Sequence, residues 1–139
     1  SINGKKIYIS LVKNPTGFNE VIRTVFSSRD KKVVLIAIND LIADGRDVSW
    51  LWDVDFEKLS SRVQRVIVTG LRAADMQLRL KYSQIEPVEK IEDVTRALDK
   101  ALSLVETGET IYIMPTYTAM LKINSILSKK GFSGNFWEN

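Results

Sequence analysis

Short runs of β-branched and aromatic residues alternate along this chain with segments whose apolar residues recur at helical spacing. Strand-like runs are found at residues 6–12, 32–38, 65–69 and 110–114, with a short edge strand expected at 86–90. Apolar stripes of helical period are found at residues 18–26, 73–81, 91–105 and 119–127. This order predicts an α/β fold, a three-layer, Rossmann-like, open and mostly parallel sheet with helices on both faces.

Cap signals place the ends of several elements. Gly108 and Gly131 follow the last two helical stripes, and each is expected to end its helix as a C-cap. Before the last helix, Thr116 or Thr118 is expected to supply the capping oxygen. A short helix is expected at residues 55–60.

Composition restricts the class of protein. The 139 residues, 45% hydrophobic and 27% charged, are typical of one soluble globular domain covering residues 1–139. The longest apolar run, residues 33–38, is too short to cross a membrane, and the first residues lead into a strand without a signal peptide. A net charge of +3 without a basic stripe argues against nucleic-acid binding. The lack of cysteine fits a cytoplasmic protein.

The segment after the buried strand at 32–38 is the most unusual part of the sequence. Residues 40–57 hold six carboxylates and two tryptophans, while the chain has no histidine and no cysteine. Acidic side chains at a strand end can orient a base, bind a metal or hold a cation. Without an imidazole or a thiol the chain cannot complete a nucleophilic triad alone, so a second polypeptide would have to supply the other groups.

Simpler interpretations of the acidic segment remain. It can be a solvated loop with an Asx-turn at Asp44 and a helix cap at Asp53 or Asp55. A divalent-metal site through Asp40, Asp44 and Asp47 is conceivable, but nothing fixes the spacing, and the commonest ligand types are missing. No metal is therefore assigned.

Ligands of open parallel sheets gather at the carboxyl ends of the strands. That rule selects the loops at residues 13–17, 39–52, 70–74 and 115–118. Lys13 and Asn14 stand where a strand leads into a helix, so an anion could meet free N–H groups and a lysine there. The alternative is a turn with an exposed lysine. Arg72 is expected at the surface or as a cation that braces a loop.

Four segments, taken in order, resemble the C-terminal domain of the MurT family, the Mur-ligase-like subunits of bacterial lipid II isoglutaminyl synthase. They are LVKNPTGFNEVIR (11–23), INDLIADGRDVSWLWDVDFEKL (38–59), VTGLRAADMQLRLKY (68–82) and IYIMPTYTAML (111–121). The resemblance implies a heterodimeric amidotransferase acting at the cytoplasmic face of the membrane. Its partner, a GatD-type glutaminase subunit, hydrolyses glutamine with its own cysteine and histidine. The MurT subunit uses ATP and Mg²⁺ to activate the α-carboxylate of D-glutamate in lipid II, which ammonia then amidates.

The resemblance also implies roles for individual residues. An aspartate of this domain reaches into the glutaminase site as the third triad member, and the GRD-V-SW motif makes it Asp47. Lys13 and Asn14 are expected near the ATP phosphates or the acyl phosphate. Expected at the partner interface are Asp44, Arg46, Ser49 and Trp50.

The family's N-terminal domain, its central ATP-binding domain and its zinc site lie outside this chain, so the domain alone should be inactive. Two other functions stay open. One is a non-catalytic docking module that recruits the glutaminase subunit, and the other is a free-standing phosphate-binding α/β protein.

Overall fold

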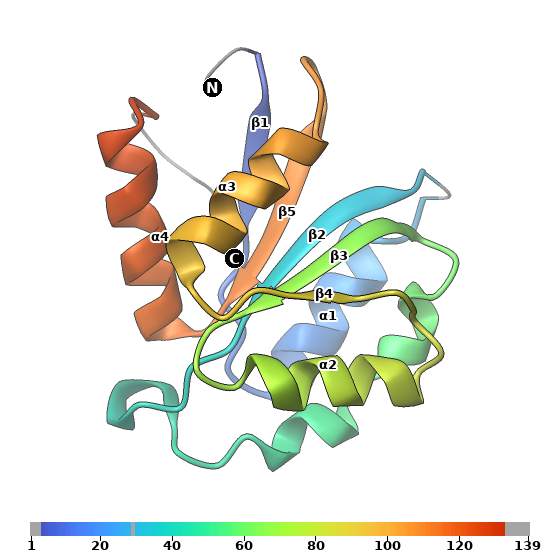
Figure 1. Ribbon diagram of the computed structural model, residues 1–139. Helices are drawn as coiled ribbons and strands as arrows, with labels where there is room; N and C mark the ends of the chain where they lie inside the picture. Colours follow the sequence, from blue (N-terminus) through green and yellow to red (C-terminus); the bar gives the residue numbers. More distant parts are fainter. Residues whose placement is uncertain (1–3, 29, 133–139) are drawn as a thin grey trace.

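The computed structural model describes residues 4–28 and 30–132, and Figure 1 shows their arrangement. The strands are β1 (Lys6–Ile9), β2 (Lys32–Ala37), β3 (Val63–Thr69), β4 (Glu89–Lys90) and β5 (Thr110–Pro115). The α-helices are α1 (Pro15–Val25), α2 (Ala73–Tyr82), α3 (Val94–Leu104) and α4 (Tyr117–Lys129). The strands form one sheet in the order β1-β5-β2-β3-β4, and every neighbouring pair is parallel. The predicted α/β architecture is confirmed.

Strand β2 lies inside the sheet and is the most deeply buried strand. It pairs with β3 on one side and with β5 on the other, and all of its residues are buried. A parallel strand that is covered on both faces needs an unbroken apolar run, which residues 33–38 provide.

Two apolar cores lie on opposite faces of the sheet. Apolar side chains of α1 and α2 pack on one face, and those of α3 and α4 pack on the other. Figure 1 shows the two helix pairs on either side of the sheet. The molecule therefore has the three predicted layers. Within the described residues, no helix is long and apolar enough to span a membrane.

The connection from β2 to β3 contains no α-helix. It is built from three short 3₁₀ helices: η1 (Ile42–Asp44), η2 (Ser49–Asp53) and η3 (Phe56–Leu59). Its apolar side chains fill the core beside α1 and α2, where Val48, Leu51, Val54, Phe56 and Leu59 are buried. The acidic segment is therefore amphipathic, with its apolar residues turned inward and most of its carboxylates exposed.

Two predictions about element ends are corrected by the backbone. Gly108 does not end a helix, because α3 stops at Leu104 and Val105 is already extended. Gly108 instead has φ = 89° in the turn before β5, and its N–H donates to Gly4 at 2.9 Å. The edge strand predicted at 86–90 is shorter, covering only Glu89–Lys90.

The prediction for the end of α4 is confirmed. Gly131 has φ = 93° and its N–H donates to the Ser128 carbonyl at 3.1 Å. The N–H of Phe132 donates to the Leu127 carbonyl at 3.0 Å. These two bonds are those of a Schellman motif, in which glycine adopts the left-handed conformation at low cost.

Candidate functional site

Three strands deliver their loops to the same edge of the sheet, and Asn39 links them. Asn39 follows the buried Ile38, two residues after the end of β2. Its backbone N–H donates to the Thr116 hydroxyl at 2.9 Å. Its side-chain NH₂ donates to the Thr118 hydroxyl at 3.0 Å, and its side-chain oxygen accepts from the Leu71 N–H at 2.9 Å. The ends of β2, β3 and β5 are thus joined by one amide side chain.

Asp44 caps helix α4 from the acidic segment. Its Oδ1 accepts from the Thr118 N–H at 2.7 Å, and its Oδ2 accepts from the Thr118 hydroxyl at 2.6 Å and the Leu41 N–H at 3.1 Å. A carboxylate at a helix N-terminus is favourably placed in the field of the helix. The prediction that Thr116 or Thr118 supplies the capping oxygen is therefore wrong. Thr116 makes no side-chain capping bond, because its hydroxyl already accepts from Asn39.

Arg72 braces the loops after β2 and β3. Its Nη1 lies 3.0 Å from the Asp40 carboxylate, and its Nε lies 2.7 Å from that of Asp75. The hydrogen bonds that Arg72 donates to Asp75 and, to a smaller extent, to Asp40 raise its pKa above the ordinary value. The prediction of a loop-bracing cation is confirmed.

Asp47 lies in the exposed loop between η1 and η2. Its Oδ1 accepts a hydrogen bond from the Ser49 N–H at 2.8 Å. That backbone bond, together with one from the Ser49 side chain, lowers the pKa of Asp47 below its ordinary value. Arg46 and Ser49 are exposed beside it, and no ion pair within the described part of the chain includes Asp47. The site therefore presents an ionised, oriented carboxylate to the outside.

The two tryptophans of the acidic segment have different roles. Trp50 is half-buried and packs against Phe18 of α1, with ring centroids 6.3 Å apart. Trp52 is 46% exposed, and its ring meets that of Tyr82 edge-on at 5.3 Å. Trp50 therefore holds the segment on the core, whereas Trp52 presents apolar surface.

The acidic side chains of the described residues are not grouped as metal ligands. Within residues 4–28 and 30–132 there is no group of three or more His, Cys, Asp or Glu residues placed to hold a metal ion. Asp40, Asp44 and Asp47 bind Arg72, Thr118 and Ser49, respectively. The cap predicted at Asp53 or Asp55 also fails, because Asp55 precedes η3 without a side-chain capping bond.

The start of α1 is less open to an anion than the sequence indicates. Asn14 is the N-cap, and its side-chain oxygen accepts from the Gly17 N–H at 2.8 Å. Its carbonyl accepts from the Phe18 N–H at 3.1 Å, and Pro15 has no N–H to offer. What remains is the single backbone N–H of Thr16 together with the exposed ammonium of Lys13. Phosphates of ATP would meet a point charge here rather than a backbone cradle.

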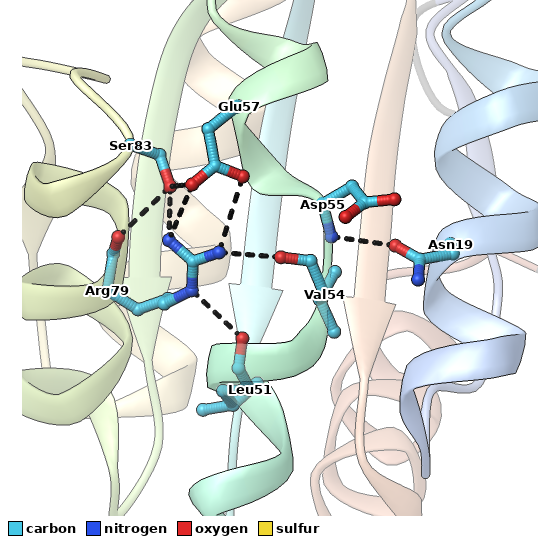
Figure 2. A network of polar contacts seen from close by, with 7 residues as sticks. All are labelled: Asn19, Leu51, Val54, Asp55, Glu57, Arg79 and Ser83. Atoms are coloured by element: carbon cyan, nitrogen blue, oxygen red, sulfur yellow. Dashed lines mark hydrogen bonds and ion pairs between the residues drawn. The ribbon is translucent and has the colours of Figure 1, made fainter.

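Arg79 of α2 is, like Asn39, a residue that the sequence analysis did not single out. The residue is 4% exposed, and its guanidinium bonds to carbonyl oxygens of the acidic segment, to Ser83 and to Glu57 (Figure 2). A bond from Glu57's own N–H and the contact with Arg79 lower the pKa of Glu57, against the effect of burial. The sequence does hold a signal, because Arg79 lies between Met76 and Leu80 on the buried stripe of α2.

Comparisons with known proteins support the resemblance seen in the sequence. Residues 11–120 match the model of a family described as MurT ligase C-terminal. A Staphylococcus aureus (strain COL) protein named lipid II isoglutaminyl synthase (glutamine-hydrolyzing) subunit MurT is 42% identical over 118 residues, or 84% of this chain and 26% of that protein. A protein of the same name from Streptococcus pneumoniae is 31% identical over 132 residues, or 93% of this chain and 29% of that protein. The chain thus spans about a quarter of the length of these curated relatives.

Solved structures share the fold at low sequence identity. A murein peptide ligase from Psychrobacter arcticus superposes with a TM-score of 0.58 at 8% identity, covering 96% of this chain and 29% of that one. A bifunctional folylpolyglutamate synthase/dihydrofolate synthase from Yersinia pestis gives a TM-score of 0.54 at 16% identity, covering 85% and 27%. Both likenesses support the three-layer α/β fold and carry no argument about function.

Proposed function

Because this chain belongs to the MurT ligase C-terminal family, we propose that it is the C-terminal domain of a glutamine-hydrolysing lipid II isoglutaminyl synthase subunit. The relatives that carry this name support the assignment. In this proposal the full-length subunit uses ATP to activate the α-carboxylate of D-glutamate in the stem peptide of lipid II, at the cytoplasmic face of the membrane. Ammonia comes from a GatD-type glutaminase partner. The domain alone has no activity.

The role proposed for this domain is to supply Asp47 to the partner's active site. The chain has no histidine and no cysteine, so the nucleophile and the base lie outside it, and this proposal assigns them to the glutaminase partner. A triad carboxylate holds the imidazole in the correct tautomer and stabilises the imidazolium that forms. It can do so from a second polypeptide, provided that it is ionised and held in place.

The state of Asp47 is the observation that carries the proposal. Among the acidic residues of the segment, Asp40 and Glu57 pair with arginines and Asp44 caps a helix. Asp47 is exposed, has its pKa lowered, and is oriented by a backbone N–H. It is therefore ready to accept a hydrogen bond from a group outside the chain.

The residues around Asp47 divide into two groups in this proposal. Arg46 and Ser49 are exposed and contact the partner directly. Asp44 and Trp50 act from within, because Asp44 binds the segment to α4 and Trp50 packs against α1. In this proposal Arg46 and Ser49 serve the interface by direct contact, and Asp44 and Trp50 serve it by holding the acidic segment in place.

Lys13 is proposed to face the ATP phosphates or the acyl phosphate when the domains of the full-length subunit close. It follows β1 at the carboxyl edge of the sheet, and its ammonium is exposed. Asn14 supports it by capping α1. ATP, held with Mg²⁺ mainly by residues outside this chain, supplies the phosphoryl group, and Lys13 would neutralise charge beside it. Lys13→Met should lower ligase turnover, whereas Lys31→Met, at the opposite edge of the sheet, should not. Unchanged turnover in Lys13→Met would remove this role.

The Asp47→Asn variant of the full-length subunit, purified with its glutaminase partner, tests the proposal. Asparagine keeps the size of the side chain but removes the charge, so the complex should form and glutamine hydrolysis should be lost. Asp53→Asn is the matched control, because Asp53 is exposed in the same segment. Its hydrolysis should stay at the wild-type rate.

A docking module without chemistry is the second candidate. The bond from Ser49 to Asp47 favours it, since that bond alone would stabilise the turn that starts η2. Under this reading, Asp47→Asn hydrolyses glutamine wherever the complex forms. Ammonia release measured at equal complex occupancy separates the two candidates.

A further inference from the structure

The guanidinium of Arg79 has a partner for each of its N–H groups. Its Nε donates to the Leu51 carbonyl at 3.0 Å, and its Nη2 donates to the Val54 carbonyl at 2.6 Å and to Glu57 Oε1 at 3.4 Å. Its Nη1 donates to Glu57 Oε2 at 3.3 Å and to the Ser83 hydroxyl. These bonds offset much of the cost of burying a cation.

The two carbonyl groups that Arg79 holds belong to the acidic segment. Leu51 lies in η2, and Val54 is the residue that ends it. The Arg79 guanidinium also lies 5.2 Å from the ring centroid of Trp52 in the same helix. Figure 2 shows the segment running between α2, which carries Arg79, and α1, whose Asn19 accepts from the Asp55 N–H. A regular helix thus fixes an irregular connection through one side chain.

Helix η2 also sets the direction of the Asp47 carboxylate. Ser49 is the first residue of η2, and its N–H is the donor that binds Asp47 Oδ1. The N-cap residue of η2, Val48, makes no side-chain capping bond, so the orientation of the Ser49 N–H follows that of the helix backbone. If η2 tilts, the Ser49 N–H tilts with it.

We propose that Arg79 is a positioning residue for the glutaminase reaction, because it fixes η2 and, through the Ser49 N–H, the direction in which Asp47 meets the partner's imidazole. This inference rests on the proposed function of Asp47. It assigns no contact between Arg79 and the reacting groups. Arg79 acts only through the geometry of the segment.

The test compares Arg79→Lys, Ser83→Ala and Asp47→Asn in the full-length subunit bound to its glutaminase partner. Lysine keeps the charge but loses the planar fork, so it cannot hold both carbonyl groups as arginine does. Ser83→Ala is the matched control, because Ser83 is buried and bonds the same guanidinium but leaves the Leu51 and Val54 contacts intact. Glutamine hydrolysis is measured as kcat and KM over a range of pH.

Arg79→Lys should lower kcat by about tenfold to a hundredfold, because small misplacements of reacting groups cost that much. KM and complex formation should stay within about twofold of wild type. A carboxylate raises the pKa of a neighbouring imidazole. In Arg79→Lys the Asp47 carboxylate is displaced, so the pKa of the imidazole should fall and the acid limb of the kcat profile should move to lower pH. Ser83→Ala should show neither change. A role in folding alone would reduce the active fraction without moving the profile.

The outcomes separate this inference from the proposed function. If Asp47→Asn hydrolyses glutamine normally, the proposed function is wrong. If Asp47→Asn is inactive but Arg79→Lys matches Ser83→Ala in kcat and pH profile, only the role of Arg79 is wrong.

Should Arg79→Lys fail to fold, hydrogen exchange in the wild-type complex decides instead. Amides of η2 that are protected like those of α2 support the inference. Amides that exchange as fast as those of an unstructured chain overturn it.

Discussion

Replacing Asp44 by Ala removes three hydrogen bonds that hold the acidic segment on the N-terminus of α4. Loss of a helix N-cap costs about 0.5–2 kcal/mol. Loss of a negative charge from the same helix end costs about 0.3–1 kcal/mol more. The free energy of unfolding should therefore fall by about 1–3 kcal/mol in Asp44→Ala. Asp44→Asn keeps a capping oxygen and should lose about half as much.

Equilibrium urea denaturation, followed by tryptophan fluorescence and by circular dichroism, measures this loss. Asp53→Ala is the control, because Asp53 is an exposed acid in the same segment and should change stability by no more than about 0.5 kcal/mol. The reasoning would be refuted if Asp44→Ala were as stable as Asp53→Ala. It would also be refuted if a fully folded Asp44→Asn variant formed no complex with the glutaminase, because Asp44 would then act by direct contact with the partner.

Two further predictions follow from backbone geometry and from charge. Gly70 has φ = 96°, and a Cβ there would lie 2.6 Å from the Ile38 carbonyl oxygen, whereas a Cβ at Gly45 would meet nothing within 4 Å. Gly70→Ala should therefore lower the melting temperature clearly more than Gly45→Ala, and equal shifts would contradict this account of the loop after β3. Asp47, whose folded pKa is lowered, contributes stability above its unfolded pKa that is lost as pH falls through the folded pKa. An NMR titration of its side-chain carboxyl carbon should give a midpoint below the ordinary value of about 3.9, and a midpoint at or above it would contradict the lowered pKa.

The fold could be predicted because its signals are local. The apolar run at 33–38 is what a strand buried on both faces requires, and the stripes of α1, α3 and α4 follow the helical period. Gly131 ends α4 as expected, since glycine in the left-handed region is a property of the turn itself. The prediction that Gly108 ends a helix was wrong, because a glycine with positive φ can equally belong to the turn before a strand.

The contacts that hold the candidate site depend on distant pairs, which local patterns do not reveal. The carboxylate of Asp44 caps a helix residue 74 positions away, and Arg79 reaches carbonyl groups 25 and 28 positions earlier in the chain. The sequence showed that the acidic segment was unusual, but not which acids were already engaged. The resemblance singled out Asp47, and the three-dimensional arrangement adds that Asp40 and Asp44 are already bound within the chain.

A structure of the full-length subunit bound to its glutaminase partner would measure the decisive distance. We predict that an Asp47 carboxylate oxygen lies within hydrogen-bonding reach, about 2.6–3.2 Å, of a ring nitrogen of the partner's catalytic imidazole. An Asp47 side chain that points into solvent, or that contacts the partner far from its imidazole, would contradict the proposal that this domain completes the glutaminase site.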